Sequence, residues 1–498
     1  MKRIGFIWVL MVACIALWAQ NQPPKHEFRG VWIPTAYNNY YRNLSVEQLK
    51  DTLVQQLDAY RKMGINTIIY QVRPEGDAFY ASELEPWSRF LTGTQGQAPE
   101  GDFDPMAFLI EECHNRCMEF HAWINPYRAN TNKKNKLSDD NRYYANRYLY
   151  VSYGNQLLFN PGFPQNREHI VKVVEDIITR YDVDGVHMDD YFYPYPLKGL
   201  KFQDIDTYKR FAKADGFDTL NQLEDWRRNN VNQLIKGISE TIKASKPWVR
   251  FGISPFGIYR NKKQDENGSD TNGLSNYDDL YADTQLWINE GWIDYVIPQL
   301  YWEIGHPVAN YTTLLYWWRE AKGPNTQLYI GQSVDRSVNQ FQQKLDLTKG
   351  DDRIGGNCFF TGDNLLTNKN GMRDSLTTLY YTQPAFAPQF SNIDSIAPNT
   401  PHRVYMDLMG DEPLLKWDIK QGKKEEDKAR YYAVYAFDPS LPIDITDMNK
   451  LWCITSKQEC PLPQGEGIQP LCLQYVVTSL DRLHNESLPS EAYLHKEE

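Results

Sequence analysis

The stretch Asp184-Gly185-Val186-His187-Met188-Asp189-Asp190-Tyr191-Phe192-Tyr193-Pro194 is a short apolar strand that ends in two carboxylates and an aromatic loop. Because side chains alternate across a strand, we expect His187 and Asp189 on one side and Asp190 on the other, unless the strand has already turned into loop. Acidic side chains are rarely buried without partners, so hydrogen bonds, a metal ion or catalysis must account for the pair. A structural role, in which one Asp caps the loop and the other pairs with an arginine, stays open on this stretch alone.

Seven further apolar segments surround this strand and alternate with amphipathic helical patterns between residue 27 and about residue 380. The other expected strands cover residues 28–34, 66–73, 119–125, 249–255, 294–302, 327–334 and 354–361. The expected helices cover residues 45–63, 105–118, 165–181, 220–246, 277–290, 310–321 and 337–347. Eight alternations predict an α/β fold, a parallel (β/α)8 TIM barrel, because right-handed crossovers place every helix outside. An open doubly wound sheet is the alternative, but no glycine-rich phosphate loop follows the first strand.

Polar side chains gather where the expected strands end. In a (β/α)8 barrel these carboxyl ends carry the active site, so the sequence predicts a site built from several strands. The residues at these ends are Arg73, Glu75, Asn125, Tyr127, Arg128, Asp189, Asp190, Ser254, Gln299, Tyr301, Trp302, Glu303, Asp335 and Arg336. Two long segments on the same face, residues 129–158 and 259–276, follow strands where loops often shape a substrate cleft. We expect this role for the tyrosine-rich residues 143–153, and a mobile surface loop for residues 262–276.

The beginning of the chain has the order of a secretory signal. Lys2 and Arg3 precede an apolar run from Ile4 to Trp18, and the small residue Ala19 follows. We expect residues 1–19 to be a signal peptide, with a periplasmic or cell-surface mature protein. Lipid attachment at Cys14 is a weaker alternative because the apolar run continues past it. No other stretch is long enough to span a membrane, so the mature chain is expected to have no transmembrane segment.

The composition restricts the partners. The net charge is −11 over 498 residues and no basic block interrupts the acidic balance, so nucleic acid is not an expected partner. Aromatic residues make up 14% of the chain, which favours surfaces that stack on flat molecules such as sugars. The sequence does not indicate whether the protein is a monomer or an oligomer.

Residues 383–498 follow a different pattern, with proline-rich segments and then short alternating strands. The pattern predicts a small all-β sandwich. The segment resembles a fibronectin type III module at Trp417, Tyr431-Tyr432-Ala433-Val434-Tyr435 and residues 475–487. The expected organisation is therefore a signal peptide (1–19), a barrel (20–382) and a fibronectin type III-like sandwich (383–498).

Six motifs distributed over nearly the whole barrel carry a second resemblance. They are Phe28-Arg29-Gly30-Val31-Trp32, the segment from Tyr70 to Ala78, Trp123-Ile124-Asn125-Pro126-Tyr127-Arg128, the segment from Asp184 to Tyr191, Ile253-Ser254-Pro255-Phe256-Gly257, and Ile297-Pro298-Gln299-Leu300-Tyr301-Trp302. Together they resemble the glycosyl hydrolase-like 10 family. The resemblance implies a secreted bacterial glycosidase-like barrel, related to the α-galactosidase and α-amylase barrels, that acts on cell-wall glycans or other polysaccharides.

Cleavage of a glycosidic bond usually needs two carboxyl groups. The resemblance implies that Asp189 is the nucleophile, with His187 in the place of an arginine that related barrels carry. A histidine keeps a neighbouring carboxylate charged only when protonated, so activation would depend on pH. The related barrels also carry an acid on the fifth strand, where this chain has Ser254. We therefore expect Asp189 as the main carboxylate and Asp190 as the second acid or an orienting partner. A carboxylate from another strand end can come from Glu303, Glu75 or Asp77, with Glu303 as the leading candidate.

The remaining strand-end residues are expected to bind a glycan substrate. They are Arg73, Glu75, Asn125, Tyr127, Arg128, His187, Tyr191, Ser254, Gln299, Tyr301 and Trp302. No cofactor and no metal are expected. Two other classes remain open: a catalytically silent glycan-binding barrel, and a metal-dependent polysaccharide deacetylase that uses His187 and the Asp pair. The deacetylase would need more histidines as metal ligands, and His121 is the only other histidine on an expected strand.

Overall fold

The computed structural model describes residues 23–38, 40–408, 413–462 and 473–494. The chain divides into two compact units. One comprises Phe28–Thr378, and the other combines the described residues up to Glu27 with those from Leu379 onward. The expected signal peptide and Cys14 lie outside the described residues.

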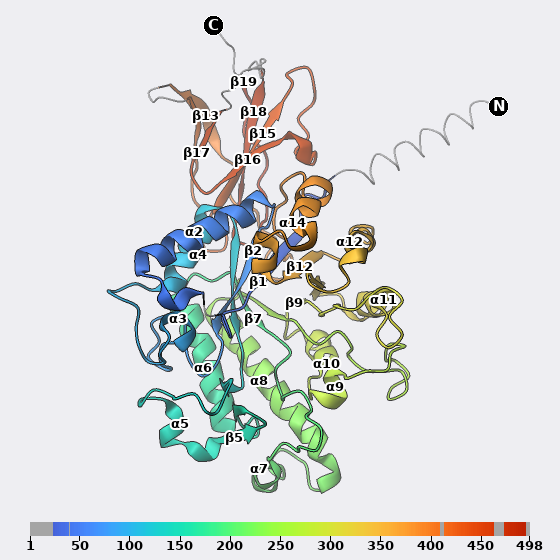
Figure 1. Cartoon of the computed structure of the whole chain (residues 1–498). Coiled ribbons are helices and arrows are strands. Elements are labelled where there is room, and N and C mark those ends of the chain that lie inside the picture. Colours follow the sequence, from blue (N-terminus) through green and yellow to red (C-terminus); the bar gives the residue numbers. More distant parts are fainter. Residues whose placement is uncertain (1–22, 39, 409–412, 463–472, 495–498) are drawn as a thin grey trace, which may run out of the picture. The chain divides into compact units, whose positions relative to one another are not determined.

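The first unit is a parallel barrel, as the sequence predicts (Figure 1). Its strands are β1 (Phe28–Ile33), β2 (Thr67–Arg73), β3 (Glu119–Ile124), β7 (Gly185–Met188), β8 (Arg250–Ile253), β9 (Tyr295–Val296), β10 (Gln327–Leu328), β11 (Ile330–Ser333) and β12 (Gly356–Phe360). Strand β10 pairs with β9, whereas β11 pairs with β12. Only Tyr329 separates β10 from β11, and its N–H donates to the Val296 carbonyl. The two segments are thus one strand that closes the ring, and eight strands line the barrel.

The barrel interior is filled by rings from alternate strands. The Tyr295 ring stacks on His187 with 5.9 Å between ring centroids. A Cβ placed on Gly252 of β8 would lie 1.9 Å from the Tyr295 ring, so only glycine fits there. The interior is therefore a packed core, and the open space lies at the barrel ends.

The helices surround the strands (Figure 1). They include α2 (Val46–Lys62), α4 (Pro105–Asn115), α6 (Pro164–Arg180), α8 (Leu223–Ser245), α11 (Tyr311–Ala321) and α12 (Phe341–Lys349). Helix α2 begins with the predicted capping box between Ser45 and Gln48. The single helix predicted for residues 277–290 is wrong: the chain forms α9 (Asn276–Asp279) and α10 (Thr284–Asn289). Tyr281 interrupts it with a φ of 54°, and Asp283 caps the start of α10.

The two long segments are folded rather than structureless. In the first, β4 (Arg128–Asn130), β5 (Tyr150–Tyr153) and β6 (Gln156–Phe159) form a small antiparallel sheet that the sequence did not predict. In the second, the buried Asn261 side-chain oxygen accepts hydrogen bonds from the Gly273 N–H and the Thr271 hydroxyl. Both segments follow strands at the carboxyl end of the barrel.

The second unit contains two antiparallel sheets. One joins β13 (His402–Asp407), β14 (Leu414–Asp418) and β17 (Glu459–Pro461), and the other joins β16 (Leu451–Thr455), β15 (Tyr431–Phe437), β18 (Gln474–Leu480) and β19 (Tyr493–Leu494). Trp417 and Cys460 from the first sheet share one buried core with Tyr432 and Val477 from the second. This shared core gives the small β-sandwich expected for the end of the chain. The likeness to fibronectin type III stays a prediction.

Within the described ranges, no helix has both the length and the apolar character needed to cross a membrane.

Candidate active site

A cavity of about 370 Å³ opens at the carboxyl end of the barrel strands. Its walls come from residues at or just after β1, β3, β7, β8, β9, β11 and β12. They are Trp32, Trp123, Asp189, Asp190, Tyr191, Tyr195, Ser254, Phe256, Gln299, Tyr301, Trp302, Arg336 and Phe360. The cavity thus combines two carboxylates with a largely aromatic wall, in the place where the sequence predicts a site.

Both carboxylates face the same cavity, which differs from the strand alternation expected from the sequence. Strand β7 ends at Met188, so Asp189 and Asp190 already belong to the loop and are not forced to opposite sides. This corrects the expectation that neighbouring carboxylates would diverge. It also means that the second carboxyl group of the cavity is the sequence neighbour of the first.

Asp189 lies among donors that favour its charged form. Its Oδ2 is 3.2 Å from the Trp123 indole nitrogen, and Oδ1 accepts from the Asn125 amide at 3.3 Å and the Tyr191 backbone N–H at 3.3 Å. Burial raises the pKa of Asp189, whereas the positive charge of Arg128 and these hydrogen bonds lower it. Burial is the largest of these effects, so the pKa of Asp189 is raised overall, while Arg128 and the donors limit the rise.

The pKa of Asp190 is raised as well. Burial and the neighbouring charge of Asp189 raise its pKa to about 7, although hydrogen bonds from Tyr195 and Gln299 oppose the rise. The Tyr195 hydroxyl is the donor in a short contact with Asp190 Oδ2. Two neighbouring buried acids that differ in their charged neighbours and hydrogen-bond donors can divide the roles of proton donor and charged group.

His187 is not a protonated, positively charged neighbour that would keep Asp189 ionised. Its Nε2 accepts from the Trp32 indole at 3.1 Å and lies 3.1 Å from the Ser254 hydroxyl, while Nδ1 lies 3.1 Å from the Tyr295 hydroxyl. Burial holds the pKa of His187 well below its ordinary value, and nearby His121 lowers it further. The ring is therefore neutral and supports the floor of the cavity, and the positive charge near Asp189 comes from Arg128. The expected pH-sensitive activation by His187 is wrong.

Arg73 and Glu75, predicted to bind substrate, are used inside the protein. The buried Arg73 guanidinium donates to both carboxylate oxygens of Glu85, at 2.7 and 2.6 Å. Glu75 is fully buried and accepts from Arg89 at 2.7 Å. Neither lines the cavity. The position of Arg73 and Glu75 at a strand end did not reveal these partners. Glu85 and Arg89 lie in loop and helix segments further along the chain.

Three more predicted residues lie behind the cavity wall. Asn125 orients Asp189, and Arg128 stacks over the Tyr191 ring with 4.7 Å to its centroid. Tyr127 is buried and does not line the cavity. Asn125 and Arg128 therefore position groups that face the cavity.

Glu303, predicted as the acid from a distant strand, has an exposed side chain and does not line the cavity. The hydrogen-bonded part of the sixth strand, β9, ends at Val296. The residues that follow it, from Gln299 to Trp302, form the cavity wall. Glu303 therefore lies beyond the wall. Among the cavity-lining residues, the carboxylates are those of Asp189 and Asp190.

The structure brings together Asp189, Asp190, Tyr191, Ser254, Gln299, Tyr301 and Trp302 from the predicted set. It also includes Arg336, which the sequence places at a strand end, and it adds Trp32, Trp123, Tyr195, Phe256 and Phe360. Trp32 and Trp123 stand one residue before the ends of their strands, a position that can mark a cavity wall. Tyr195 follows a proline-rich turn and has no comparable sequence signal.

The described residues contain no group of three or more His, Cys, Asp or Glu side chains placed to hold a metal ion. His121 and His187 both contact the Tyr295 hydroxyl inside the barrel. The two histidines considered for a deacetylase therefore serve the hydrogen-bonded interior.

The chain is similar to known glycosyl hydrolases. The chain is 41% identical over 490 residues to glycosyl hydrolase YngK of Bacillus subtilis (strain 168), covering 95% of this chain and 94% of that protein. It is 34% identical over 383 residues to glycosyl hydrolase DigH of Escherichia coli (strain K12), covering 70% and 85%. Among solved structures, the PgaB (BpsB) glycoside hydrolase domain from Bordetella bronchiseptica is similar, with a TM-score of 0.48 and 11% identity over 71% of this chain and 99% of that domain. The model of the glycosyl hydrolase-like 10 family matches residues 27–347, and the chain belongs to this family.

Proposed function

We propose that this protein is a secreted glycoside hydrolase that cleaves a polysaccharide or cell-wall glycan, with Asp190 as general acid and Asp189 as the charged carboxylate. The observation that carries the proposal is the pairing of two buried carboxylates with unequal surroundings in one aromatic cavity. The family and the printed names of YngK and DigH, both glycosyl hydrolases, support it.

The chemistry follows from the two acids. With a pKa of about 7, Asp190 carries a proton under neutral or mildly acidic conditions and can give it to the departing glycosidic oxygen. Positive charge then develops on the sugar ring, and Asp189 can stabilise or attack it. The donors from Trp123, Asn125 and Tyr191 fix the carboxylate of Asp189 before substrate binds.

The aromatic wall suits a sugar. Tyr191, Tyr301 and Trp302 present apolar ring faces, while the Gln299 and Ser254 side chains lie at the same wall. A sugar offers both an apolar ring face and hydroxyl groups, so stacking and hydrogen bonding can act together.

Secretion rests on residues 1–19 alone. Expression in a bacterial host followed by N-terminal sequencing of the mature protein tests it. A mature chain that starts near Gln20 and is found outside the inner membrane supports the proposal, and a full-length cytoplasmic product contradicts it.

The activity is tested by incubating the protein with isolated bacterial cell walls and purified polysaccharides, and by identifying products with mass spectrometry. We expect new reducing ends with wild type and at least about 100-fold fewer with Asp189→Asn or Asp190→Asn. Binding of a glycan without turnover by the wild type would instead identify a catalytically silent glycan-binding barrel. Glycan turnover retained by both variants would exclude the proposed acids.

A further inference from the structure

We propose that a second, larger cavity at the same end of the barrel is a distal subsite that binds neutral sugar residues of the polysaccharide chain. The cavity has a volume of about 920 Å³. It is lined by segments that follow the first three strands: Tyr37 and Arg42, residues 89–90 and 93–96, and residues 131–132 and 135–140. This inference rests on the proposed function, and it adds a place where the enzyme recognises chain length.

The guanidinium of Arg42 points to a ligand. It lies over the Phe90 ring with 5.6 Å to the centroid, and its buried Nε has no hydrogen-bond partner among the described residues. The same is true of the buried Ser138 hydroxyl on the other side of the cavity. Polar atoms left unpaired inside a protein are uncommon, so two that border one cavity favour a site that a polar molecule completes.

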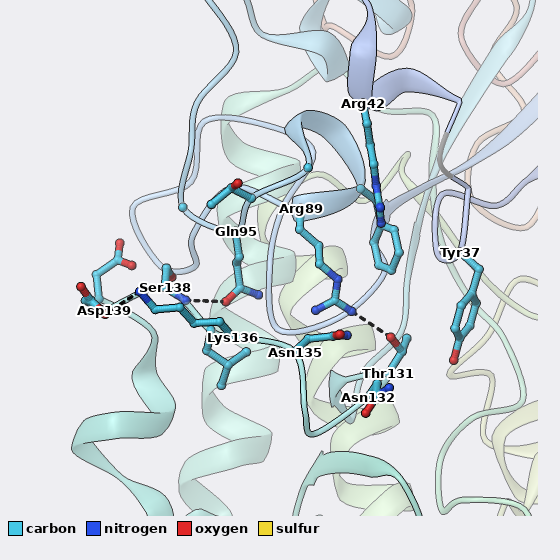
Figure 2. Close-up of a pocket in the computed structure, with 16 residues that line it drawn as sticks. Tyr37, Arg42, Arg89, Gln95, Thr131, Asn132, Asn135, Lys136, Ser138 and Asp139 are labelled. Carbon is cyan, nitrogen blue, oxygen red and sulfur yellow. Dashed lines mark hydrogen bonds and ion pairs between the residues drawn. The ribbon is translucent and has the colours of Figure 1, made fainter.

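The lining favours neutral hydroxyl groups over an ion. Figure 2 shows Arg42 and Tyr37 on one side of the cavity, and Lys136, Ser138 and Asp139 on the other. The carboxylates of Asp139 and Asp140 offset the charges of Arg42 and Lys136, so the cavity offers both donors and acceptors without a single dominant charge. The Tyr37 side chain is 65% exposed and offers a ring face on which a sugar can pack.

The walls are fixed before any ligand arrives. Arg89 donates to Glu75 at 2.7 Å and to Thr131 at 2.8 Å, which joins the residues after β2 to those after β3 (Figure 2). Gln95 accepts from the Ser138 backbone N–H at 3.1 Å and donates to Asp77 at 3.1 Å. A preformed cavity of this kind loses little conformational freedom on binding, which favours a site over an accidental gap.

A short stretch of chain connects the two cavities. Asn125 holds Asp189 at the catalytic cavity, and Thr131 lines the second cavity six residues later. Six residues span about 20 Å at full extension, so the two sites lie within reach of a few consecutive sugar rings. The geometry therefore suits one glycan chain that occupies both cavities.

The test compares a long and a short substrate with the full-length protein. We expect Tyr37→Ala and Arg42→Ala to lower kcat/KM on a polysaccharide that the wild type cleaves by roughly 5- to 100-fold, mainly through KM. Turnover of a short aryl glycoside, which fills only the catalytic cavity, should stay unchanged. Tyr316→Ala, an exposed tyrosine on α11 that lines neither cavity, is the matched control and should change neither. Equal losses on both substrates, or no loss on the polysaccharide, would overturn the proposal.

Binding to arrayed glycan fragments of increasing length separates this inference from the proposed function. Loss of long-fragment binding in Arg42→Ala supports the subsite even if the wild type cleaves nothing, in which case the hydrolase proposal alone fails. Hydrolysis by the wild type with unaffected long-fragment binding in both variants defeats the subsite alone. Binding should vary little between low and high salt, and a steep loss with salt would indicate an anionic ligand and contradict the neutral-sugar assignment.

Discussion

The side-chain amide of Asn125 holds the carboxylate of Asp189, with Nδ2 3.3 Å from Oδ1 and 3.5 Å from Oδ2. The amide itself is oriented, because its oxygen accepts the Arg128 backbone N–H at 2.9 Å. The NH₂ group must therefore point to Asp189. This relationship assigns Asn125, which the sequence suggested as a substrate-binding residue, to the support of a carboxylate.

Replacing Asn125 with Ala removes that donor and leaves Asp189 buried with fewer partners. We expect kcat to fall by up to about 100-fold, because a small misplacement of a reacting group has a large effect on rate. Since the lost hydrogen bonds favoured the charged form, the pKa of Asp189 should rise and the acid limb of the pH–rate profile should move to higher pH. Profiles of kcat and of kcat/KM against pH measure both effects, and an unmoved acid limb would contradict this role.

The pKa of Asp190 predicts where activity falls on the alkaline side of the pH–rate profile. A general acid must be protonated, and the pKa of Asp190 is about 7, so activity should fall as pH rises through about 7. Asp190→Asn should lower kcat by about 10²- to 10⁴-fold and abolish this limb in the residual activity. Asp102→Asn, an exposed carboxylate outside the cavity, is the control. An alkaline limb that persists in Asp190→Asn would assign it to another group.

The same carboxyl group should make the protein less stable at high pH. Its pKa in the folded state, about 7, is above the ordinary value of 3.8, so the folded protein binds the proton more tightly than the unfolded chain. The associated stability is present at pH 4 and is lost as pH rises to 7, by roughly 4 kcal/mol. Asp190→Asn should therefore raise the free energy of unfolding at pH 8 more than at pH 4. Denaturant unfolding at the two pH values measures this, and equal changes at both would refute it.

Arg73 should matter for stability through Glu85. Both side chains are buried, and Arg73, together with the hydrogen bond to His169, lowers the pKa of Glu85 to about 2 against the effect of burial. Glu85→Ala leaves a buried guanidinium without its partner, and we expect a loss of about 3–5 kcal/mol. Glu47→Ala breaks the exposed pair with Lys50 and should cost less than about 1 kcal/mol. Equal effects in thermal unfolding would contradict the assignment of Arg73 to the protein interior.

His187 should not set the pH dependence. Because the ring is neutral and accepts from Trp32, a glutamine at this position can still accept a hydrogen bond. We expect His187→Gln to lower kcat modestly and to leave both limbs of the pH–rate profile in place. If the acid limb disappears in this variant, a protonated His187 takes part after all.

Strand positions were predictable because burial leaves a continuous apolar run, and eight such runs separated by helical patterns have one common solution. The extra antiparallel sheet after β3 was not predictable, since its strands are short and lie in a polar, tyrosine-rich segment. The break between α9 and α10 was hidden for another reason: Tyr281 adopts a left-handed conformation that its residue type does not announce.

The candidate site also has features that the sequence predicts and features that only the structure reveals. The sequence by itself determined that polar and aromatic residues collect at one end of a parallel barrel, and that the Asp189–Asp190 pair stands there. Only the tertiary structure decided their use, because hydrogen bonds and ion pairs join residues far apart in the chain. It directed Arg73 to Glu85 and Asn125 to Asp189, left Glu303 outside the cavity, and brought Asp190 beside Asp189 because β7 ends one residue before them. Alternation along a strand is a local rule, whereas the point at which a strand ends depends on the neighbours with which it pairs.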